Sequence, residues 1–231
     1  MTLSNSYLAD ILVETDMMSR DKSLNLWNLL VHVLLSDIPG EVVELGCHAG
    51  LTGVMFQKTM DFFGSTKSLH LYDSFQGLPA PTCKDDRVVF EKGSLSTSEQ
   101  SVFDNFYRFD VKCPLVHCGW FKDSLPNGLP SKIAFAYLDS DMYESTLGSL
   151  QHVYPRMSSS AVGVIDDYYD SDIHPMVESK LSKKQPTRIL ELTPGVKKAC
   201  DEFFADKPEK PIVLVSGSET QAFFIKDKKF Q

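Results

Sequence analysis

The sequence contains little cysteine and little positive charge, and it has no long apolar run. Its 231 residues include five cysteines, an odd number, and no C-x-x-C pair. Neither a disulfide framework nor a zinc ribbon is therefore indicated. Asp and Glu (31) outnumber Lys and Arg (23), which gives a formal net charge of −8. This charge disfavours binding to nucleic acid or to an anionic membrane surface.

Signals for secretion and membrane insertion are also missing. No run of about 18 apolar residues occurs, so no membrane-spanning helix is expected. The opening segment contains Asp10, Glu14 and Asp16 and lacks a basic stretch followed by an apolar one. We therefore expect a cytoplasmic protein. Hydrophobic residues make up 42% of the chain and charged residues 23%. This balance predicts one globular domain over 1–231 that needs no disulfide or structural metal.

The cysteine pattern leaves one alternative open. Cys113 and Cys118 flank a strand-like run that contains His117. The three residues suit part of a zinc site, but no second pair of ligands follows them. We interpret both cysteines as packing residues.

Short apolar runs alternate with helical patterns, which is typical of a doubly wound, mostly parallel α/β sheet. The chain opens with a helical region, 1–37, centred on Tyr7–Ser36 and ended by Ile38-Pro39-Gly40. Apolar residues recur there at helical spacing: Leu24, Trp27, Leu30, Val31, Leu34 and Leu35. Buried strands are expected at Glu41–Leu45, Ser68–Tyr72, Cys113–His117, Ile133–Leu138 and Ala161–Ile165. Helices are expected at Thr52–Phe63, Thr97–Phe109, Ser145–Tyr154 and Gly195–Ala205.

Two further apolar runs close the chain. They are Ile212–Val215 and Gln221–Ile225, joined by residues 216–220. A loop this short permits only antiparallel pairing. Five parallel strands followed by an antiparallel hairpin distinguish this sheet from a plain dinucleotide-binding domain.

The segment 169–193 is long and polar and directly follows a predicted strand. It contains Asp170, Asp172 and His174, and then four basic residues. It can be a solvated loop with a short helix, or a lid over a substrate, because long connections in compact domains are often functional.

Carboxylates follow nearly every predicted strand. Glu44, Asp73 and Asp139 end the first, second and fourth strands, and Asp166 with Asp167 ends the fifth. In an open α/β sheet, ligands bind outside the carboxyl ends of the strands. A bound cation is the simplest physical reason to gather mutually repelling charges at one edge.

The first strand leads into a glycine turn, Gly46-Cys47-His48-Ala49-Gly50. Gly46 allows a ligand to approach the backbone closely because it has no Cβ. The pattern is not G-x-G-x-x-G, so a pyrophosphate cradle is weakly supported. Glu44 before the turn would repel a phosphate but suits an ammonium or sulfonium group. An ordinary strand-to-helix turn is the alternative.

Asp73 ends the second strand and is suited to accept hydrogen bonds from both hydroxyls of a ribose. An Asp that only caps a loop would look the same in the sequence. Together with the glycine turn, 27 residues earlier, Asp73 favours an adenosine-containing ligand.

Asp139 and the Asp166–Asp167 pair are expected at neighbouring strand ends. Three carboxylates without a thiol or imidazole partner suit a hard cation such as Mg²⁺, Mn²⁺ or Ca²⁺. Any of these residues, or Asp141, can instead cap a helix.

Taken together, these motifs resemble the macrocin O-methyltransferase family, whose members methylate hydroxyls on sugars of macrolides and related natural products. The likeness covers about 24–168 and resumes near 194–199. It rests on Glu44-x-Gly46-x-x-x-Gly50, Asp73-Ser74-Phe75-x-Gly77-Leu78-Pro79, Gly119-Trp120-Phe121-Lys122-Asp123-Ser124-Leu125-Pro126, Leu138-Asp139-x-Asp141-x-Tyr143-Glu144-Ser145-Thr146 and Ile165-Asp166-Asp167-Tyr168.

The resemblance implies a class I methyltransferase fold, a seven-stranded Rossmann-like sheet, and an enzyme that uses S-adenosylmethionine and Mg²⁺ or another hard divalent cation. By position, Asp139, Asp166 and Asp167 would hold the metal, and Asp141 would be the catalytic base beside Asp139. The implied cofactor residues are Glu44, Leu45, Gly46, Cys47, His48, Asp73, Ser74, Phe75, Gly77, Leu95, Trp120 and Phe121, the last two beside the adenine. The implied partner is a hydroxylated small molecule, and a homo-oligomer stays open.

Two departures from the family pattern are visible. Ser140 stands where the family commonly has Gly, and 169–193 is longer than the usual connection. Among the histidines that compete with Asp141 as base (His48, His117, His152 and His174), His174 is the one to test. The rival functions are a metal-dependent hydrolase or nucleotide-sugar enzyme on a similar sheet, and an inactive S-adenosylmethionine-binding module.

Overall fold

One seven-stranded sheet, in the order β3-β2-β1-β4-β5-β7-β6, forms the centre of the computed structural model. The structure describes residues 8, 10–15, 17–181, 189 and 191–227. The strands are β1 (Glu41–Leu45), β2 (Leu69–Asp73), β3 (Leu115–Cys118), β4 (Ile133–Leu138), β5 (Met157–Asp166), β6 (Ile212–Ser216) and β7 (Glu219–Ile225). β1 to β5 pair in parallel, whereas β7 is antiparallel to both β5 and β6. The predicted sheet and its terminal hairpin are confirmed. The edge strand β3, however, is not buried as predicted, and Cys113 and Cys118 are exposed rather than packed.

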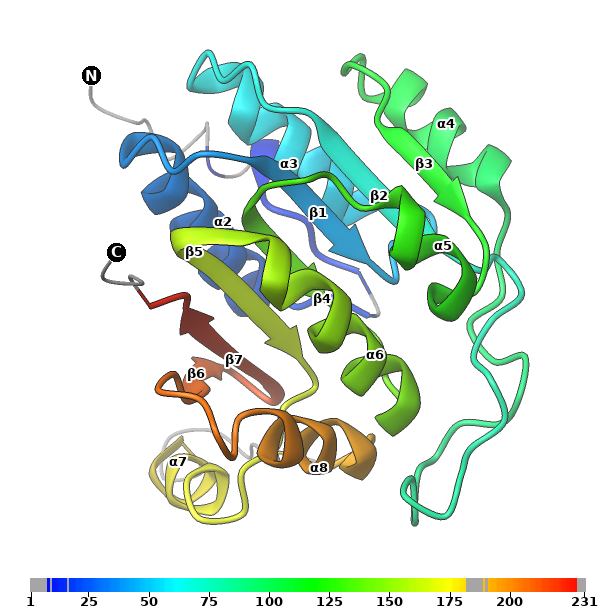
Figure 1. The fold of residues 1–231 in the computed structure, drawn as a ribbon, viewed down its shortest axis with the longest axis vertical. Helices are drawn as coiled ribbons and strands as arrows, with labels where there is room; N and C mark the ends of the chain where they lie inside the picture. The colour runs from blue at the N-terminus through cyan, green and yellow to red at the C-terminus, as the bar shows by residue number, and fades with distance from the viewer. Residues whose placement is uncertain (1–7, 9, 16, 182–188, 190, 228–231) are drawn as a thin grey trace.

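Helices cover both faces of the sheet (Figure 1). They are α2 (Arg20–Leu35), α3 (Leu51–Phe62), α4 (Glu99–Arg108), α5 (Phe121–Gly128), α6 (Tyr143–Val153), α7 (His174–Leu181) and α8 (Pro194–Phe203). On one face α3 packs against both α2 and α4, and on the other α6 packs against α5 and α8. Each chain segment that leaves a parallel strand at its carboxyl end therefore starts at the same edge of the sheet.

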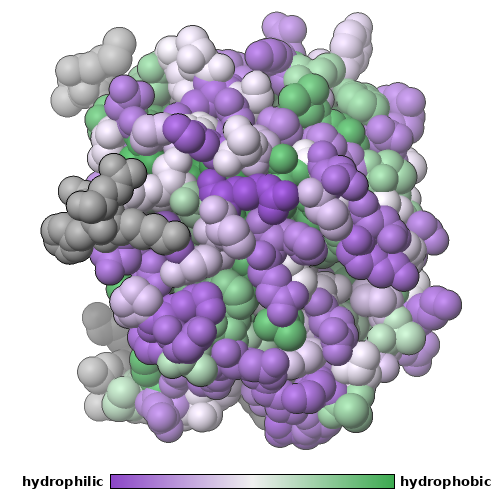
Figure 2. All heavy atoms as spheres, viewed as in Figure 1, coloured by the Kyte–Doolittle hydropathy of each residue, from purple (hydrophilic) through white to green (hydrophobic). Residues whose placement is uncertain are grey.

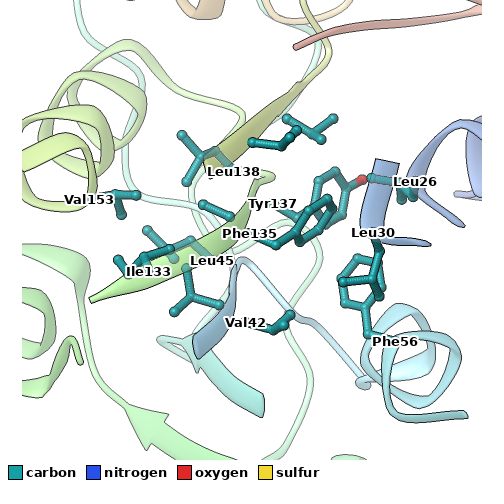
Figure 3. Close-up of a cluster of buried hydrophobic side chains, with 14 of the residues drawn as sticks. Leu26, Leu30, Val42, Leu45, Phe56, Ile133, Phe135, Tyr137, Leu138 and Val153 are labelled. Atoms are coloured by element: carbon teal, nitrogen blue, oxygen red, sulfur yellow. The ribbon is translucent and has the colours of Figure 1, made fainter. Parts of the chain in front are cut away.

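The core is thickest around β4, whose six residues are all buried. Phe135 and Tyr137 point from β4 toward Leu26 and Leu30 of α2 and toward Phe56 of α3 (Figure 3). The Phe56 ring meets the rings of Phe135 and Tyr137 edge-on, with centroids 5.4 and 6.1 Å apart. Edge-to-face packing of this kind adds to the free energy gained from apolar burial.

The opening helix is shorter than the sequence suggested. The predicted helical region over Tyr7–Ser36 is interrupted: Leu8, Asp10 and Ile11 are helical, but α2 begins only at Arg20, after Ser19, whose side chain accepts a hydrogen bond from the Lys22 N–H. Before it, Thr15 and Met18 form an isolated antiparallel bridge. Residues 1–7, 9 and 16 of the predicted region lie outside the described residues.

The buried stripe of α2 also differs from the predicted one. Leu24 and Leu35 are 36% and 70% exposed. The residues that face the sheet are Lys22, Ser23, Leu26, Trp27, Leu30 and Val33. Lys22, Leu26 and Leu30 share one helix face through their i, i+4, i+8 spacing. The apolar pattern does not reveal this face as buried, because its first residue is charged.

Two helices did not emerge as separate elements from the sequence. The segment that forms α5 contains Pro126 and ends in Gly128, which reads as a loop. α7 lies inside the predicted lid or insert 169–193, where a short helix was one of the alternatives; residues 182–188 and 190 of that segment lie outside the described residues.

The face seen in Figure 1 is mostly hydrophilic, and its apolar patches are small and separated (Figure 2). None of the described helices combines the length and apolar character needed to cross a bilayer.

The packing around β4 predicts the cost of opening a cavity there. Phe56→Ala should lower the free energy of unfolding by about 3–5 kcal/mol, because its fully buried ring leaves a hole that the sheet cannot fill. The exposed Tyr107→Ala (88% exposed) is the control and should change it by less than about 0.5 kcal/mol. Urea unfolding of both variants measures the difference; equal losses would contradict this account of the core.

Candidate active site

A cavity of about 540 Å³ opens at the carboxyl edge of β1, β2, β4 and β5. Nearly all predicted site residues line it: Glu44, Gly46, Cys47, His48, Asp73, Ser74, Gly77, Leu95, Trp120, Phe121, Asp139, Asp141, Asp166 and Asp167. Two predicted residues do not line it. Leu45 is buried in the core and Phe75 packs against the core. Leu45 ends β1 and Phe75 lies in the loop after β2, but neither side chain lines the cavity.

The glycine turn forms a wall of the cavity that only a residue without Cβ can make. Gly46 has φ +87°, and a Cβ built on it would lie 1.8 Å from the carbonyl oxygen of Asp139. The Gly46 N–H donates to the Tyr72 carbonyl (2.8 Å) and the Asp139 N–H donates to the Leu45 carbonyl (2.9 Å). Close approach of β1, β2 and β4 at this point therefore depends on Gly46.

Asp73 ties two cavity loops together. One carboxylate oxygen accepts from the His48 N–H (2.8 Å) and the other from the Phe75 N–H (2.7 Å). Burial raises the pKa of Asp73, although these two hydrogen bonds oppose the shift. A carboxylate offers about four acceptor positions, so Asp73 keeps capacity for the hydroxyls of a ligand.

Glu44 is the polar group in this part of the cavity that lacks a partner. It is 1% exposed, and its Oε2 is buried without a hydrogen bond. Burial, followed by the nearby Asp73 and Asp166 charges, raises its pKa well above the usual value. A buried acceptor without a donor costs free energy, and a cationic ligand group beside it would remove that cost.

Four carboxylates gather at the ends of β4 and β5. Burial and the mutual repulsion of these side chains raise the pKa values of Asp139 and Asp141 far above normal, with Asp166 and Asp167 the main charged neighbours of Asp139 and Asp141 respectively. Burial also raises the pKa of Asp166 to about 7. Such like-charged groups titrate as a unit.

Asp141 faces the cavity and does not cap α6, because another residue accepts a hydrogen bond from the first turn of that helix. Asp85, from the loop after β2, accepts a hydrogen bond from the Tyr143 N–H (2.6 Å). Met142 is the N-cap and provides no side-chain bond. The alternative interpretation of Asp141 as the helix cap is therefore wrong.

A lysine that the sequence analysis missed lies in the acidic cluster. The Lys22 ammonium is 2.6 Å from Asp166 Oδ2 and 3.8 Å from Asp167 Oδ1. Burial alone would lower the pKa of Lys22, but the carboxylates around it outweigh burial and raise it. Its position could have been found from Leu26, because residues four apart lie on one helix face.

The donor chemistry of the cluster suits a hard divalent cation, since four carboxylates repel one another where water is excluded. In this structure, however, the Asp166 carboxylate forms an ion pair with Lys22. Within the described residues, no three acid, His or Cys side chains are grouped as a ready ligand set. The metal expectation for Asp139, Asp166 and Asp167 therefore stays a prediction.

Other cavity residues were also missed. They come from the segment before α2 (Val13, Thr15, Met17, Met18), from loops and helix starts (Ala49, Leu51, Thr52, Leu78, Pro79, Phe90, Ser140, Ser145, Leu192) and from the β6–β7 hairpin (Ser218, Glu219, Thr220). Of the predicted lid 169–193, Leu192 lines the cavity among the described residues. The first group was assigned to a helix, so its contact with the cavity was not anticipated.

His174 does not line the cavity. Its Nδ1 accepts from the Asp170 N–H (2.8 Å), and its ring stacks on Tyr169 at 5.0 Å between centroids. Burial lowers its pKa. In this structure the contacts of His174 are with its own loop and not with the acidic cluster.

Comparison with known proteins gives matches to one family. The sequence profile described as Macrocin-O-methyltransferase (TylF) matches residues 12–186. The chain is 31% identical over 153 residues to the 8-demethyl-8-(2,3-dimethoxy-alpha-L-rhamnosyl)-tetracenomycin-C 4'-O-methyltransferase of Streptomyces olivaceus. The aligned region covers 62% of this chain and 59% of that protein. It is 30% identical over 155 residues to the mycinamicin III 3''-O-methyltransferase of Micromonospora griseorubida, with 62% and 61% covered. The match thus spans less than two thirds of these relatives.

A solved structure shares the fold. The O-methyltransferase NovP superimposes with a TM-score of 0.75 at 23% identity, covering 92% of this chain and 82% of that one.

The acidic cluster predicts the pH dependence of stability in the presence of a chelator. Asp139 and Asp141 hold protons in the folded protein at pH values where the unfolded chain, with a reference pKa of about 3.9, has lost them. Because the folded state binds more protons, stability is greatest near the unfolded pKa and falls as pH rises through the raised values. The melting temperature in EDTA should therefore fall as the pH is raised above the unfolded pKa of about 3.9.

Asp141→Asn should flatten this slope, whereas Asp123→Asn, at an exposed position of α5, should leave it unchanged. Melting curves of the three proteins across this range test the point. A melting temperature that rises with pH in the wild type would contradict it.

Proposed function

The chain belongs to the macrocin-O-methyltransferase family, and on that premise we propose that it transfers a methyl group from S-adenosylmethionine to a hydroxyl of a small-molecule natural product, such as a sugar of an antibiotic intermediate. One observation carries the proposal: a single cavity joins the glycine wall and unpartnered Glu44 to the acidic cluster around Asp141. The printed names of the two sequence relatives, one acting on a rhamnosyl-tetracenomycin and one on mycinamicin III, support the substrate class.

The proposed cofactor half lies along β1 and β2. Glu44 offers its free, buried oxygen to the positively charged end of the cofactor, which removes the cost of an unpaired acceptor. Gly46 leaves room for close approach to the backbone. Asp73, held by two backbone N–H groups, presents its remaining acceptor positions to the ribose hydroxyls. Trp120 and Phe121 border the adenine.

The proposed chemical half lies at the ends of β4 and β5. S-adenosylmethionine supplies a methyl group activated by a sulfonium, and a divalent cation, when bound by Asp139, Asp166 and Asp167, supplies a Lewis acid that lowers the pKa of a hydroxyl. Asp141 accepts the proton of the acceptor hydroxyl. Burial and the Asp167 and Asp166 charges raise the pKa of Asp141, and a divalent cation bound by these neighbouring carboxylates would oppose that shift and favour the ionised form of Asp141, which can accept the proton. Walls that hold both substrates in line for transfer supply the remaining acceleration.

Incubation with deuteromethyl-labelled S-adenosylmethionine and a panel of glycosylated polyketides tests the function. The expected product carries the mass of one labelled methyl group. Calorimetry should show cofactor binding that Glu44→Gln weakens at least about tenfold and that Glu99→Gln, an exposed control on α4, leaves intact. Absence of cofactor binding would favour the rival hydrolase class, and binding without any transfer would favour an inactive module.

The role of Asp141 is tested separately. Asp141→Asn keeps the size of the side chain but cannot accept the proton, so kcat should fall about 10²–10⁴-fold. Its affinity for S-adenosylmethionine should stay within about twofold of the wild-type value, since the proposed cofactor contacts lie on β1 and β2. A kcat close to that of the wild type would assign the proton to another base.

A further inference from the structure

Lys22 is a buried cation inside the acidic cluster, and neither the motifs nor the proposed mechanism uses it. Its side chain is 4% exposed, and the side chain of its partner Asp166 is 3% exposed. It reaches the cluster from α2, the helix before the sheet, and not from a strand end. Its ammonium therefore lies against Asp166, one of the metal ligands that the resemblance implies.

Both oxygens of Asp166 are engaged by the protein. Oδ2 contacts the Lys22 ammonium at 2.6 Å, and Oδ1 accepts from the Gln221 amide at 3.3 Å. The Gln221 amide oxygen in turn accepts from Ser216 Oγ (3.1 Å) and from the Asn25 amide (3.4 Å). Asp166 is thus held between α2 and the terminal hairpin and has no oxygen that is free of a protein partner.

The start of α2 is fixed as firmly as Asp166. The Ser19 N–H donates to Glu219 Oε2 of β7 (3.0 Å), and Ser19 Oγ accepts from the Lys22 N–H (3.2 Å). Leu26, one turn later on the same face, is fully buried. The backbone of Lys22 therefore stays in place, while its long side chain is the part that can leave Asp166.

Electrostatics makes Lys22 and a divalent cation competitors. A cation that uses Asp166 must displace the ammonium, and a cation held by Asp139 and Asp167 alone still meets its repulsion at short range. The repulsion between the Lys22 ammonium and a bound cation is strong because the cluster is shielded from water. Charges interact more strongly in the protein interior than at the surface.

We propose that Lys22 sets the cation affinity of this site: its ammonium occupies Asp166, so that a divalent cation binds weakly and gains Asp166 as a ligand only when Lys22 withdraws. This inference rests on the proposed function, in which the site takes a divalent cation. It assigns Lys22 as a positioning residue that acts through Asp166.

Titration with Mn²⁺, followed by the electron paramagnetic resonance signal of the free ion, tests the inference without turnover, cofactor or acceptor. Lys22→Met keeps an apolar side chain of similar length and removes the charge. Its dissociation constant for Mn²⁺ should be at least about tenfold lower than that of the wild type. Lys198→Met, which removes an exposed lysine paired with the exposed Asp86, should match the wild type.

Lys22→Arg is the second variant and retains the positive charge. It should bind Mn²⁺ as weakly as the wild type, and its folding is checked by its melting temperature. If Lys22→Met does not fold, Lys22→Gln replaces it and should likewise bind Mn²⁺ at least about tenfold more tightly than the wild type.

Each remaining outcome is decisive. Equal or weaker Mn²⁺ binding by Lys22→Met overturns the inference and leaves the proposed methyl transfer standing. If neither the wild type nor the variant binds Mn²⁺, both the inference and the metal part of the proposed function fail. Methyl transfer measured in EDTA then judges the transfer reaction by itself.

Discussion

Repulsion among buried carboxylates is the constraint that organises the functional edge of this molecule. Asp139, Asp141, Asp166 and Asp167 lie within one another's electrostatic reach, and burial raises the pKa of each of the first three. A fold that gathers such charges must neutralise them with protons, with a cation or with both. Lys22 supplies one positive charge from α2, and protons or the proposed divalent cation would neutralise the rest.

The backbone of the same edge is conformationally strained. Of the nine non-glycine residues with positive φ in the described part of the chain, five are predicted site residues: His48, Phe75, Leu95, Asp141 and Asp167. Such conformations cost about 1–3 kcal/mol each and persist where the surroundings hold them. Asp73 provides part of that hold, because its carboxylate binds the backbone at His48 and Phe75. Charge and backbone strain are thus concentrated at the same place, which is typical of a site built for a ligand.

The sequence predicted the sheet well because buried strands leave an unambiguous apolar pattern, as in Ile133–Leu138. It predicted most of the cavity wall because carboxyl ends of parallel strands must meet at one edge. It failed where the decisive contact is non-local. Lys22 faces Asp166 across 144 residues of sequence. Leu24 and Leu35 belong to the apolar pattern of the helix and yet are exposed, because periodicity alone does not say which helical face meets the sheet. Leu45 and Phe75 belong to the right segments, the end of β1 and the loop after β2, but the direction of their side chains depends on packing that a motif does not encode.

The contacts of Asn25 with the hairpin have a consequence for assembly during synthesis. Its amide donates to the Val215 carbonyl and to Ser216 Oγ at 3.1 and 2.9 Å, joining segments about 190 residues apart. Closing so long a loop is slow compared with local helix formation. A ribosome-bound chain that has not yet released β6 and β7 can already pack α2 on α3, β4 and β5, but it lacks the partners of Asn25 and the wall of the cavity that the hairpin supplies.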